Sequence, residues 1–274
     1  MKLGYVCTNY NNSHFTVTAA RSLVANGGHD VAIVVVDNAS APAERQILAD
    51  LEQCLAQVQV IFSPDNVGYF SGLNLGIDRL RQTRPDIEWM VVGNNDLEFA
   101  SDFIDRLAAG APRWVGHSVI SPDVVTVDGE HQNPHVISGI SRVREIFYDL
   151  YYANYELGML IQKLAMRFRR FSDRDDETQW QTAQPIYQGH GSCYLLGPRF
   201  FAQFERLWAP TFMMSEEYFL AKQLNDVGEQ VYYDPAVQVI HHWHASLATL
   251  PSRRRWELAR DAHLEYRKYV KVFG

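Results

Sequence analysis

Three short clusters hold the side chains of this 274-residue chain best suited to binding a polar ligand or moving a proton. The first runs from Asn94 to Asp96, with Glu98 close behind, directly after the apolar run "WMVVG". The second is the pair Glu216 and Glu217, and the third is the histidine-rich stretch "HHWHAS". Carboxylate and amide oxygens suit hard cations such as Mg²⁺ and Mn²⁺, and a carboxylate can accept a proton from a hydroxyl group. Asn and Asp are also typical of plain turns, where they bind their own backbone.

The elements predicted around the first cluster favour a site over a turn. Strand patterns in "LGYVCT", "DVAIVVVDNAS", "VQVIFS" and "IEWMVVGNND" alternate with helix patterns over 15–25, 43–57 and from Gly68 to Arg84. This alternation predicts a parallel sheet with helices on both faces, and such sheets bind ligands beyond the carboxyl ends of their strands. The polar stretches "TNYNN", "VDNAS" and "GNNDLEF" all fall at those ends. A shared binding site explains this better than several unrelated turns.

The second half of the chain is predicted to be less regular. The run "YYANYELGMLIQKLAMRFRRF" has the pattern of one amphipathic helix that ends in arginines. A strand and the start of a helix are predicted in "YQGHGSCYLLGPRFF", and a helix in "SEEYFLAKQLNDVG" that stops at Gly228. The stretch "QVYYDPAVQVIHHWHAS" predicts strand, turn and strand, and a charged helix from Arg253 to Lys271 closes the chain.

The overall composition restricts the class of protein. Hydrophobic residues make up 47% of the chain, so a sizeable core can form. The net charge of -7 argues against a general nucleic-acid binder. Cys7, Cys54 and Cys193 form no CxxC pair, which favours a reduced, cytoplasmic setting over a disulfide framework. We see neither the pattern of a signal peptide nor an apolar run near the roughly 20 residues of a spanning helix.

The order of these motifs resembles that of the family 2 glycosyltransferases with the GT-A fold, in particular the bacterial rhamnosyltransferase-like branch. The stretches that carry the resemblance are "VVVDNAS", "NVGYFSGLNLGI", "GNNDLEF", "GSCYLLGPRFF", "SEEYFLAKQLNDVG" and "DPAVQVIHHWHAS". The resemblance implies one continuous α/β domain with a mostly parallel, Rossmann-like sheet flanked by helices. Its parts would be a nucleotide-sugar-binding half (1–120), a variable and partly helical insert (121–185), an acceptor-binding and catalytic half (186–250) and a C-terminal helix (251–274).

The resemblance further implies a metal-dependent, inverting transferase. It would move a hexose or deoxyhexose, such as rhamnose, from a nucleotide diphosphate sugar to a hydroxyl group of a bacterial surface glycan. Asp96 holds the final position of the family's metal motif, and His241, six positions after Pro235, matches a histidine at the metal or the diphosphate. Bound Mn²⁺ or Mg²⁺ would stabilise the charge that develops on the diphosphate. A zinc site built on the histidine cluster is less well supported, because the cluster has no Cys partner and no HxxxH spacing.

Several strand-end residues match the family's donor site. Asn95 would contact the ribose or the sugar, and Asp37 the base or the ribose. Two structural alternatives stay open: Asp37 could cap the helix that follows it, and Gly72 could simply pack a tight loop instead of approaching phosphate. The residues matched to nucleotide-sugar binding are Thr8, Tyr10, Asp37, Asn38, Asn66, Gly68, Gly72, Asn74 and Asn95.

The catalytic base follows from the same resemblance. An inverting transferase needs a carboxylate that takes the proton of the acceptor hydroxyl. Glu217 matches the family's catalytic Asp, with Glu216 before it, although both could instead complement a helix N-terminus. Gly191 resembles a residue that lines the acceptor cleft, where a side chain would block the sugar. The helix departs from the family pattern at Phe219, where Asp is common, and at Gln223, where Arg is common.

Two other classes of protein compete with this interpretation. A sugar nucleotidyltransferase usually carries a Gly-rich, basic loop near its N-terminus, and "TNYNNSHF" has neither property. A non-catalytic glycan-binding or scaffold relative would fit the changes at positions 219 and 223.

The expected partners of a transferase are the nucleotide-sugar donor and a glycan or lipid-linked glycan acceptor. The apolar side of the insert and the arginines 167, 169, 170 and 253–255 allow a peripheral contact at the inner face of the membrane. Packing on the catalytic domain or on a second subunit of a homo-oligomer explains the same pattern.

Overall fold

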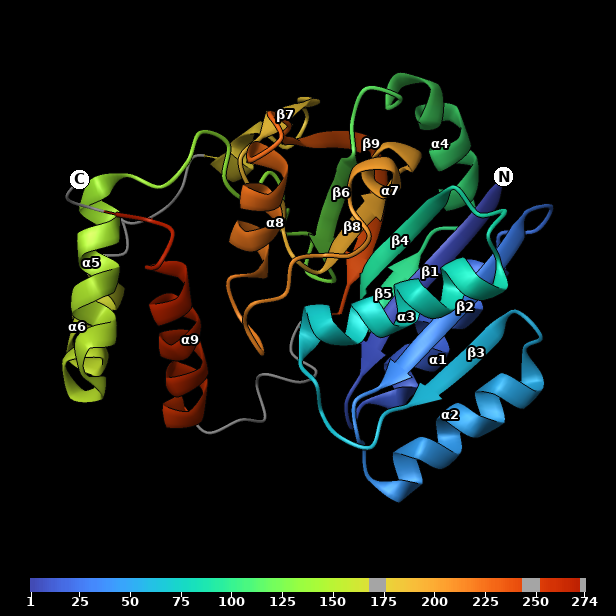
Figure 1. Ribbon diagram of the computed structural model, residues 1–274, viewed down its shortest axis with the longest axis horizontal. Coiled ribbons are helices and arrows are strands. Elements are labelled where there is room, and N and C mark those ends of the chain that lie inside the picture. Colours follow the sequence, from blue (N-terminus) through green and yellow to red (C-terminus); the bar gives the residue numbers. More distant parts are fainter. Residues whose placement is uncertain (168–175, 243–251, 272–274) are drawn as a thin grey trace.

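The computed structural model describes residues 1–167, 176–242 and 252–271. A central sheet runs through the molecule in the order β3-β2-β1-β4-β8-β6-β9-β5, with β7 beside β9 (Figure 1). The strands are β1 (Lys2–Asn9), β2 (Asp30–Asp37), β3 (Val58–Phe62), β4 (Trp89–Asn94), β5 (Leu97–Phe99), β6 (Val119–Thr126), β7 (Gln184–Ile186), β8 (Cys193–Leu196) and β9 (Val231–His241). The helices are α1 (Ser13–Val24), α2 (Pro42–Cys54), α3 (Tyr69–Thr83), α4 (Phe103–Gly110), α5 (Arg142–Ala153), α6 (Tyr155–Arg167), α7 (Pro198–Gln203), α8 (Glu216–Asn225) and α9 (Ser252–Tyr266), with short 3-10 turns at Ala111–Arg113 and Asp176–Gln179.

The first half of the sheet confirms the predicted parallel arrangement. Strands β3, β2, β1 and β4 are parallel neighbours. Their alternate side chains enter two cores: one lies under α1, α2 and α4, and the other under α3, α7 and α8. Burial on both faces explains why β1, β2 and β4 are nearly continuous apolar runs, whereas in the outermost strand β3 only Val58 is buried. The register places Asn9 beside Asp37 and Thr8 beside Asn94, so the three polar strand ends share one edge of the sheet.

The second half of the sheet is mixed rather than parallel. Strand β8 runs antiparallel to both β4 and β6, and β9 pairs in parallel with β6 but antiparallel with β5 and β7. The predicted turn inside "DPAV" is wrong, because β9 passes through it as one strand. Its register against β6 jumps from Asp234 opposite Pro122 to Gln238 opposite Asp123. Such a bulge accommodates Pro235, which cannot donate to the ladder.

The insert contains two helices instead of the single one predicted. Asn154 has extended backbone (φ -153°, ψ 143°) after α5, and its Oδ1 accepts the backbone N–H of Glu156 at 2.8 Å. An Asn that caps a new helix in this way ends the previous one, so α6 begins at Tyr155. Arg169 and Arg170 lie outside the described residues, and the boundary predicted between residues 120 and 121 falls inside β6.

Helices α5, α6 and α9 stand together beside α8, away from the sheet (Figure 1). We call this group the helical lobe. Cys7 and Cys193 are buried in the main domain and Cys54 is exposed, and all three thiols are free.

Candidate active site

The side-chain amide of Asn95 connects the end of β4 to neighbouring segments through hydrogen bonds. Its side chain is 5% exposed and donates to Asn9 Oδ1 at 3.1 Å, Asn12 Oδ1 at 2.8 Å and Thr16 Oγ1 at 2.7 Å. These bonds tie the end of β4 to β1 and to the start of α1. The predicted contact with ribose or sugar stays a prediction, and the side chain already has a structural role.

Asp96 and His241 meet directly after β4. Both side chains are buried, and His241 Nε2 lies 3.3 Å from Asp96 Oδ1. His241 Nδ1 lies 2.7 Å from Gln132 Oε1, an acceptor, which fixes the proton on Nδ1, and the lone pair of Nε2 accepts a hydrogen bond from the side-chain amide of Asn94 at 3.2 Å. Asp96 Oδ1 receives no hydrogen bond within the described residues. The unpartnered Asp96 oxygen and His241 Nε2 therefore lie close together in a buried place, and a shared cation would stabilise both of them if it replaced the Asn94 contact.

The chemistry of this pair fits a divalent cation. A histidine whose second ring nitrogen is fixed by an amide oxygen has the tautomer and orientation of a metal ligand. No group of three or more His, Cys, Asp or Glu in the described ranges is arranged to hold a metal ion. The pair therefore needs further ligands, and Mg²⁺ in enzymes commonly takes them from water and from substrate phosphates.

A strained loop positions Glu217. Met214 and Ser215, immediately before α8, have φ angles of 77° and 65°, a conformation that costs non-glycine residues energy and is common at functional sites. Glu217 Oε1 then accepts the backbone N–H of Gly191 at 3.2 Å. A Cβ atom on Gly191 would lie 2.5 Å from the same oxygen, so glycine is required here for the carboxylate to keep its place.

Short backbone contacts connect the Glu217 side of the site with the Asp96 side. The N–H of Asn94 donates to Ser192 O at 2.8 Å, one residue from Gly191. The hydroxyl of Tyr69, at the start of α3, donates to Gly191 O at 2.7 Å. The predicted metal, base and acceptor-side residues thus gather at one edge of the sheet. Sequence reasoning assigned no role to Tyr69, although it lies inside "NVGYFSGLNLGI".

Burial favours the neutral form of Glu216 on α8. Burial raises the pKa of Glu216 to about 8, and the nearby Glu217 adds to this effect. Glu216 Oε1 is buried and has no hydrogen-bond partner among the described residues. At neutral pH, Glu216 is therefore mostly a neutral acid, which cannot take a proton. Glu217 is the member of the pair suited to act as a base.

This difference predicts how stability depends on pH. The pKa of Glu216 is higher in the folded state than the usual 4.5 of a glutamate, so ionisation lowers the free energy of unfolding as pH rises toward 8. Glu216→Gln removes that loss. We expect the melting temperature of the variant, relative to the unmodified protein, to increase from pH 5 to pH 8. A constant difference across this range would contradict the raised pKa. The exposed Glu88 gives the control Glu88→Gln, which should leave the pH profile unchanged.

Two further histidines, His190 and His135, lie next to the Asp96–His241 pair. His190 Nδ1 lies 2.8 Å from Ser192 Oγ, and its ring centroid is 5.6 Å from that of His241 and 5.8 Å from that of His135. Burial lowers the pKa of His190 well below 6.5, and His135 and His241 lower it further. The ring is therefore neutral at pH 7. Sequence reasoning missed His190, and its only signal was its place before Gly191 in "GHGSC".

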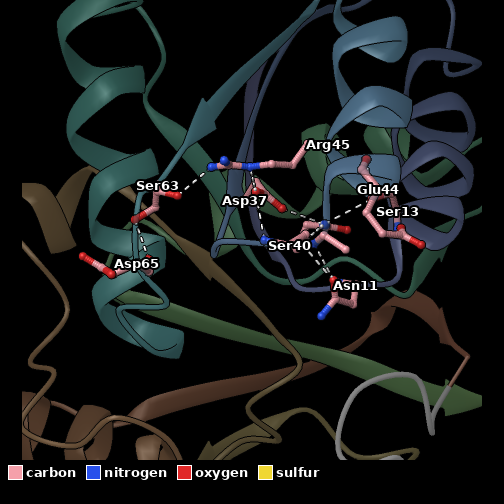
Figure 2. A network of polar contacts seen from close by, with 10 residues as sticks. Asn11, Ser13, Asp37, Ser40, Glu44, Arg45, Ser63 and Asp65 are labelled. Carbon is pink, nitrogen blue, oxygen red and sulfur yellow. Dashed lines mark hydrogen bonds and ion pairs between the residues drawn. The ribbon is translucent and has the colours of Figure 1, made fainter.

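Asp37 is engaged within the protein (Figure 2). Its side chain is fully buried and accepts hydrogen bonds from Arg45 Nε at 2.8 Å, the Ser40 backbone N–H at 3.2 Å and Asn9 Nδ2 at 3.1 Å. Arg45 also donates to Ser63 O at 2.7 Å, which ties α2 to the end of β3. Asp37 does not cap α2, because the N-cap of that helix is Ala41 and has no side-chain cap hydrogen bond. The carboxylate instead holds the turn before α2 and pairs with Arg45 within the helix. The contact of Asp37 with a base or ribose stays a prediction.

The start of α3 is closed by a loop from the second half of the chain. Gly68 has a φ angle of 90°, and a Cβ atom there would lie 2.1 Å from Phe212 O. The same carbonyl accepts the N–H of Tyr69 at 3.0 Å, and Asn66 Oδ1 accepts the N–H of Gly68 at 3.0 Å. One donor of this helix N-terminus is therefore already occupied, which weakens the predicted phosphate contact at this point.

The other donor-side residues fall into two groups. Gly72 lies against the strand ends, because a Cβ atom on it would be 2.7 Å from Thr8 Cγ2 and 3.2 Å from Asn38 Nδ2. Asn38 Oδ1 is buried without a hydrogen-bond partner in the described residues, and the side chain of Tyr10 is exposed. Asn74, in contrast, exchanges two hydrogen bonds with the backbone of residue 207 and serves the fold. The geometry therefore favours Thr8, Tyr10 and Asn38 as ligand contacts over Asn74.

The two departures from the family pattern on α8 also serve the fold. Phe219 is fully buried and packs edge-on against Trp208, with ring centroids 5.1 Å apart. Gln223 accepts the N–H of Trp208 at 2.9 Å and donates to Arg206 O at 2.8 Å. Neither side chain approaches Glu217 through these contacts, so the changes leave the base in place.

The family model "Glycosyl transferase family 2" matches residues 6–175. This span is more than half of the chain. The chain belongs to glycosyl transferase family 2. The chain is similar in sequence to an N-acetylglucosaminyl-diphospho-decaprenol L-rhamnosyltransferase of Mycobacterium tuberculosis. The two sequences are 24% identical over 223 residues. The match covers 77% of this family 2 chain and 66% of the relative, so the chain spans slightly less than two thirds of its length.

Solved structures show that this family 2 chain has the GT-A fold. A mannosyltransferase from Pyrobaculum calidifontis, PcManGT, in complex with GDP-Man and Mn²⁺, matches 98% of the chain with a TM-score of 0.58 and 12% identity. S. aureus TarS 1-349 in complex with UDP-GlcNAc matches 92% of it with a TM-score of 0.54 and 12% identity. The chain covers 65% and 62% of these two proteins. Both likenesses concern the fold alone.

Proposed function

We propose that this chain is a metal-dependent, inverting glycosyltransferase. It moves a hexose or deoxyhexose, with rhamnose the first candidate, from a nucleoside diphosphate donor to a hydroxyl group of a lipid-linked surface glycan. The observation that carries the proposal is that the Asp96–His241 pair and the Gly191–Glu217 contact are joined through the hydrogen bond between Asn94 and Ser192.

Each residue has a chemical role in this proposal. Asp96 and His241 hold Mn²⁺ or Mg²⁺, which neutralises charge on the diphosphate when bound. Glu217 accepts the proton of the acceptor hydroxyl, since Glu216 beside it is neutral at pH 7. Gly191 leaves room for the acceptor next to that carboxylate. The nucleoside of the donor binds at the ends of β1 and β2, in contact with Thr8, Tyr10 and Asn38.

The names of the similar proteins support the choice of substrates. The M. tuberculosis relative is an L-rhamnosyltransferase acting on a decaprenol-linked acceptor, and the two solved neighbours hold UDP-GlcNAc and GDP-Man. The PcManGT complex also contains Mn²⁺. These ligands share a nucleoside diphosphate bonded to a sugar.

A panel of nucleotide sugars tests the proposed function. We expect one UDP-, GDP- or dTDP-linked sugar to raise the melting temperature only when Mn²⁺ or Mg²⁺ is present, because a ligand that binds the native state alone stabilises it. The same donor should be hydrolysed slowly without an acceptor. Binding with no turnover would identify a non-catalytic relative, and no binding of any donor with metal would refute the proposal.

A further inference from the structure

Helices α5 and α6 leave an apolar stripe uncovered. On α5 the residues are Val143, Ile146, Phe147 and Leu150, and on α6 they are Leu157, Leu160 and Leu164. Val143 is 78% exposed, Leu160 53%, Leu150 51% and Leu164 50%. Their spacing of three and four residues puts them on one side of each helix. We call these seven residues the α5–α6 apolar face.

The opposite sides of the two helices are already used. Glu145 on α5 is buried and accepts hydrogen bonds from the Tyr266 hydroxyl and from Arg267. Asp149 forms ion pairs with His263 and Arg267. Gly158 on α6 lies so close to Trp256 that a Cβ atom would be 2.8 Å from its Nε1. The lobe is therefore packed in place, and among the residues that the structure describes the α5–α6 apolar face stays exposed.

Charge separates the helical lobe from the rest of the molecule. Residues 142–167 and 252–271 contain 11 Lys and Arg against 6 Asp and Glu, whereas the whole chain contains 25 against 32. The basic side chains of Arg142, Lys163 and Arg253 to Arg255 are exposed. Two of the acidic groups, Glu145 and Asp149, are already bound by Arg267. An acidic protein thus carries one basic, partly apolar lobe.

We propose that the α5–α6 apolar face docks the protein on an anionic lipid surface. Large exposed apolar side chains with basic neighbours complement acyl chains and anionic headgroups together. A symmetric contact with a second copy of the chain would place the same basic groups opposite one another. None of the helices in the described ranges is long and apolar enough to cross a membrane.

The lobe is also connected to the proposed base. Tyr266 on α9 packs edge-on against Tyr218, with ring centroids 4.3 Å apart, and Tyr218 directly follows Glu217. When α5 and α6 bind a lipid surface, this contact therefore also sets the position of the start of α8 relative to the lipid. Delivery of a lipid-linked acceptor to Glu217 rests on the proposed function, whereas binding to the lipid surface does not.

Flotation with vesicles tests the docking. We expect the full chain to float with phosphatidylcholine vesicles that contain phosphatidylglycerol, and to float less as salt increases. Substituting Phe147, Leu150, Leu160 and Leu164 by Ser should weaken binding at least roughly tenfold, because the variant buries much less apolar surface in the lipid. The matched control is Val115→Ser with Val127→Ser, two residues that are 74% and 66% exposed outside the lobe.

A second pair of variants separates charge from apolar contact. Arg142→Ser with Lys163→Ser should lower binding to anionic vesicles at least roughly tenfold, because each basic group adds to the attraction of the anionic surface. Arg21→Ser with Arg79→Ser, exposed on other helices, should not.

Three outcomes would overturn the proposal: no flotation at low salt, equal binding by the Ser variants, or a dimer in light scattering that the face variant abolishes without any vesicle binding. Donor hydrolysis in solution should be the same in all lobe variants. If the unmodified chain does not hydrolyse the donor, this result would count against the proposed function and not against the docking.

Discussion

Replacing Glu217 by Gln is expected to lower sugar transfer about 10²-fold or more, the usual contribution of a general base. The amide keeps the size of the side chain and its contact with the Gly191 N–H, but it cannot accept the proton of the acceptor hydroxyl. The variant should still bind the donor. The rise in melting temperature that the donor causes measures this binding. Transfer of labelled sugar at saturating donor and acceptor is the measurement.

Glu216→Gln is the matched control for this variant. Its carboxyl is neutral at pH 7, so the variant should keep most of the turnover. If Glu216→Gln is inactive and Glu217→Gln is active, the two roles are reversed and the assignment of the base is refuted. If both variants keep the turnover of the unmodified protein, neither glutamate of α8 acts as the base.

Asp96→Asn is expected to cut transfer at least roughly tenfold, which corresponds to more than about 1.4 kcal/mol of transition-state stabilisation. The amide removes the negative charge that faces His241 Nε2, so the pair holds a divalent cation less tightly. Stabilisation of the donor complex by Mn²⁺ should weaken in parallel. Titration of Mn²⁺ in the presence of donor, read by melting temperature, measures this without any turnover.

The exposed Asp128 supplies the control variant Asp128→Asn, which should titrate with Mn²⁺ like the unmodified chain. Partial recovery of Asp96→Asn at high Mn²⁺ fits a weakened metal site. Unchanged turnover and an unchanged Mn²⁺ titration would exclude Asp96 from the site.

The sequence predicted the first half of the fold because local signals and burial agree there. Each strand of that half is an apolar run followed by a polar strand end, and each helix is amphipathic. Parallel pairing follows from this alternation alone. The second half needed the structure, since an apolar run such as β8 gives no sign of its direction in the sheet. The bulge in β9 and the break at Asn154 likewise depend on packing and capping that periodicity does not report.

The sequence by itself placed the polar residues at the strand ends and pointed to the family, because both depend on order along the chain. It could not say which of those residues face a ligand. Asn95 and Asp37 lie in the strongest motifs, yet their side chains are engaged by Asn9, Asn12 and Arg45.

Only the tertiary structure decided how the candidate site is assembled. Gln132 orients His241 across 109 residues, and Gly191 meets Glu217 across 26. The protonation of Glu216 also depends on burial, which the surrounding chain sets after folding. Contacts between distant residues and the exclusion of water are properties of the folded chain, so no local pattern in the sequence encodes them.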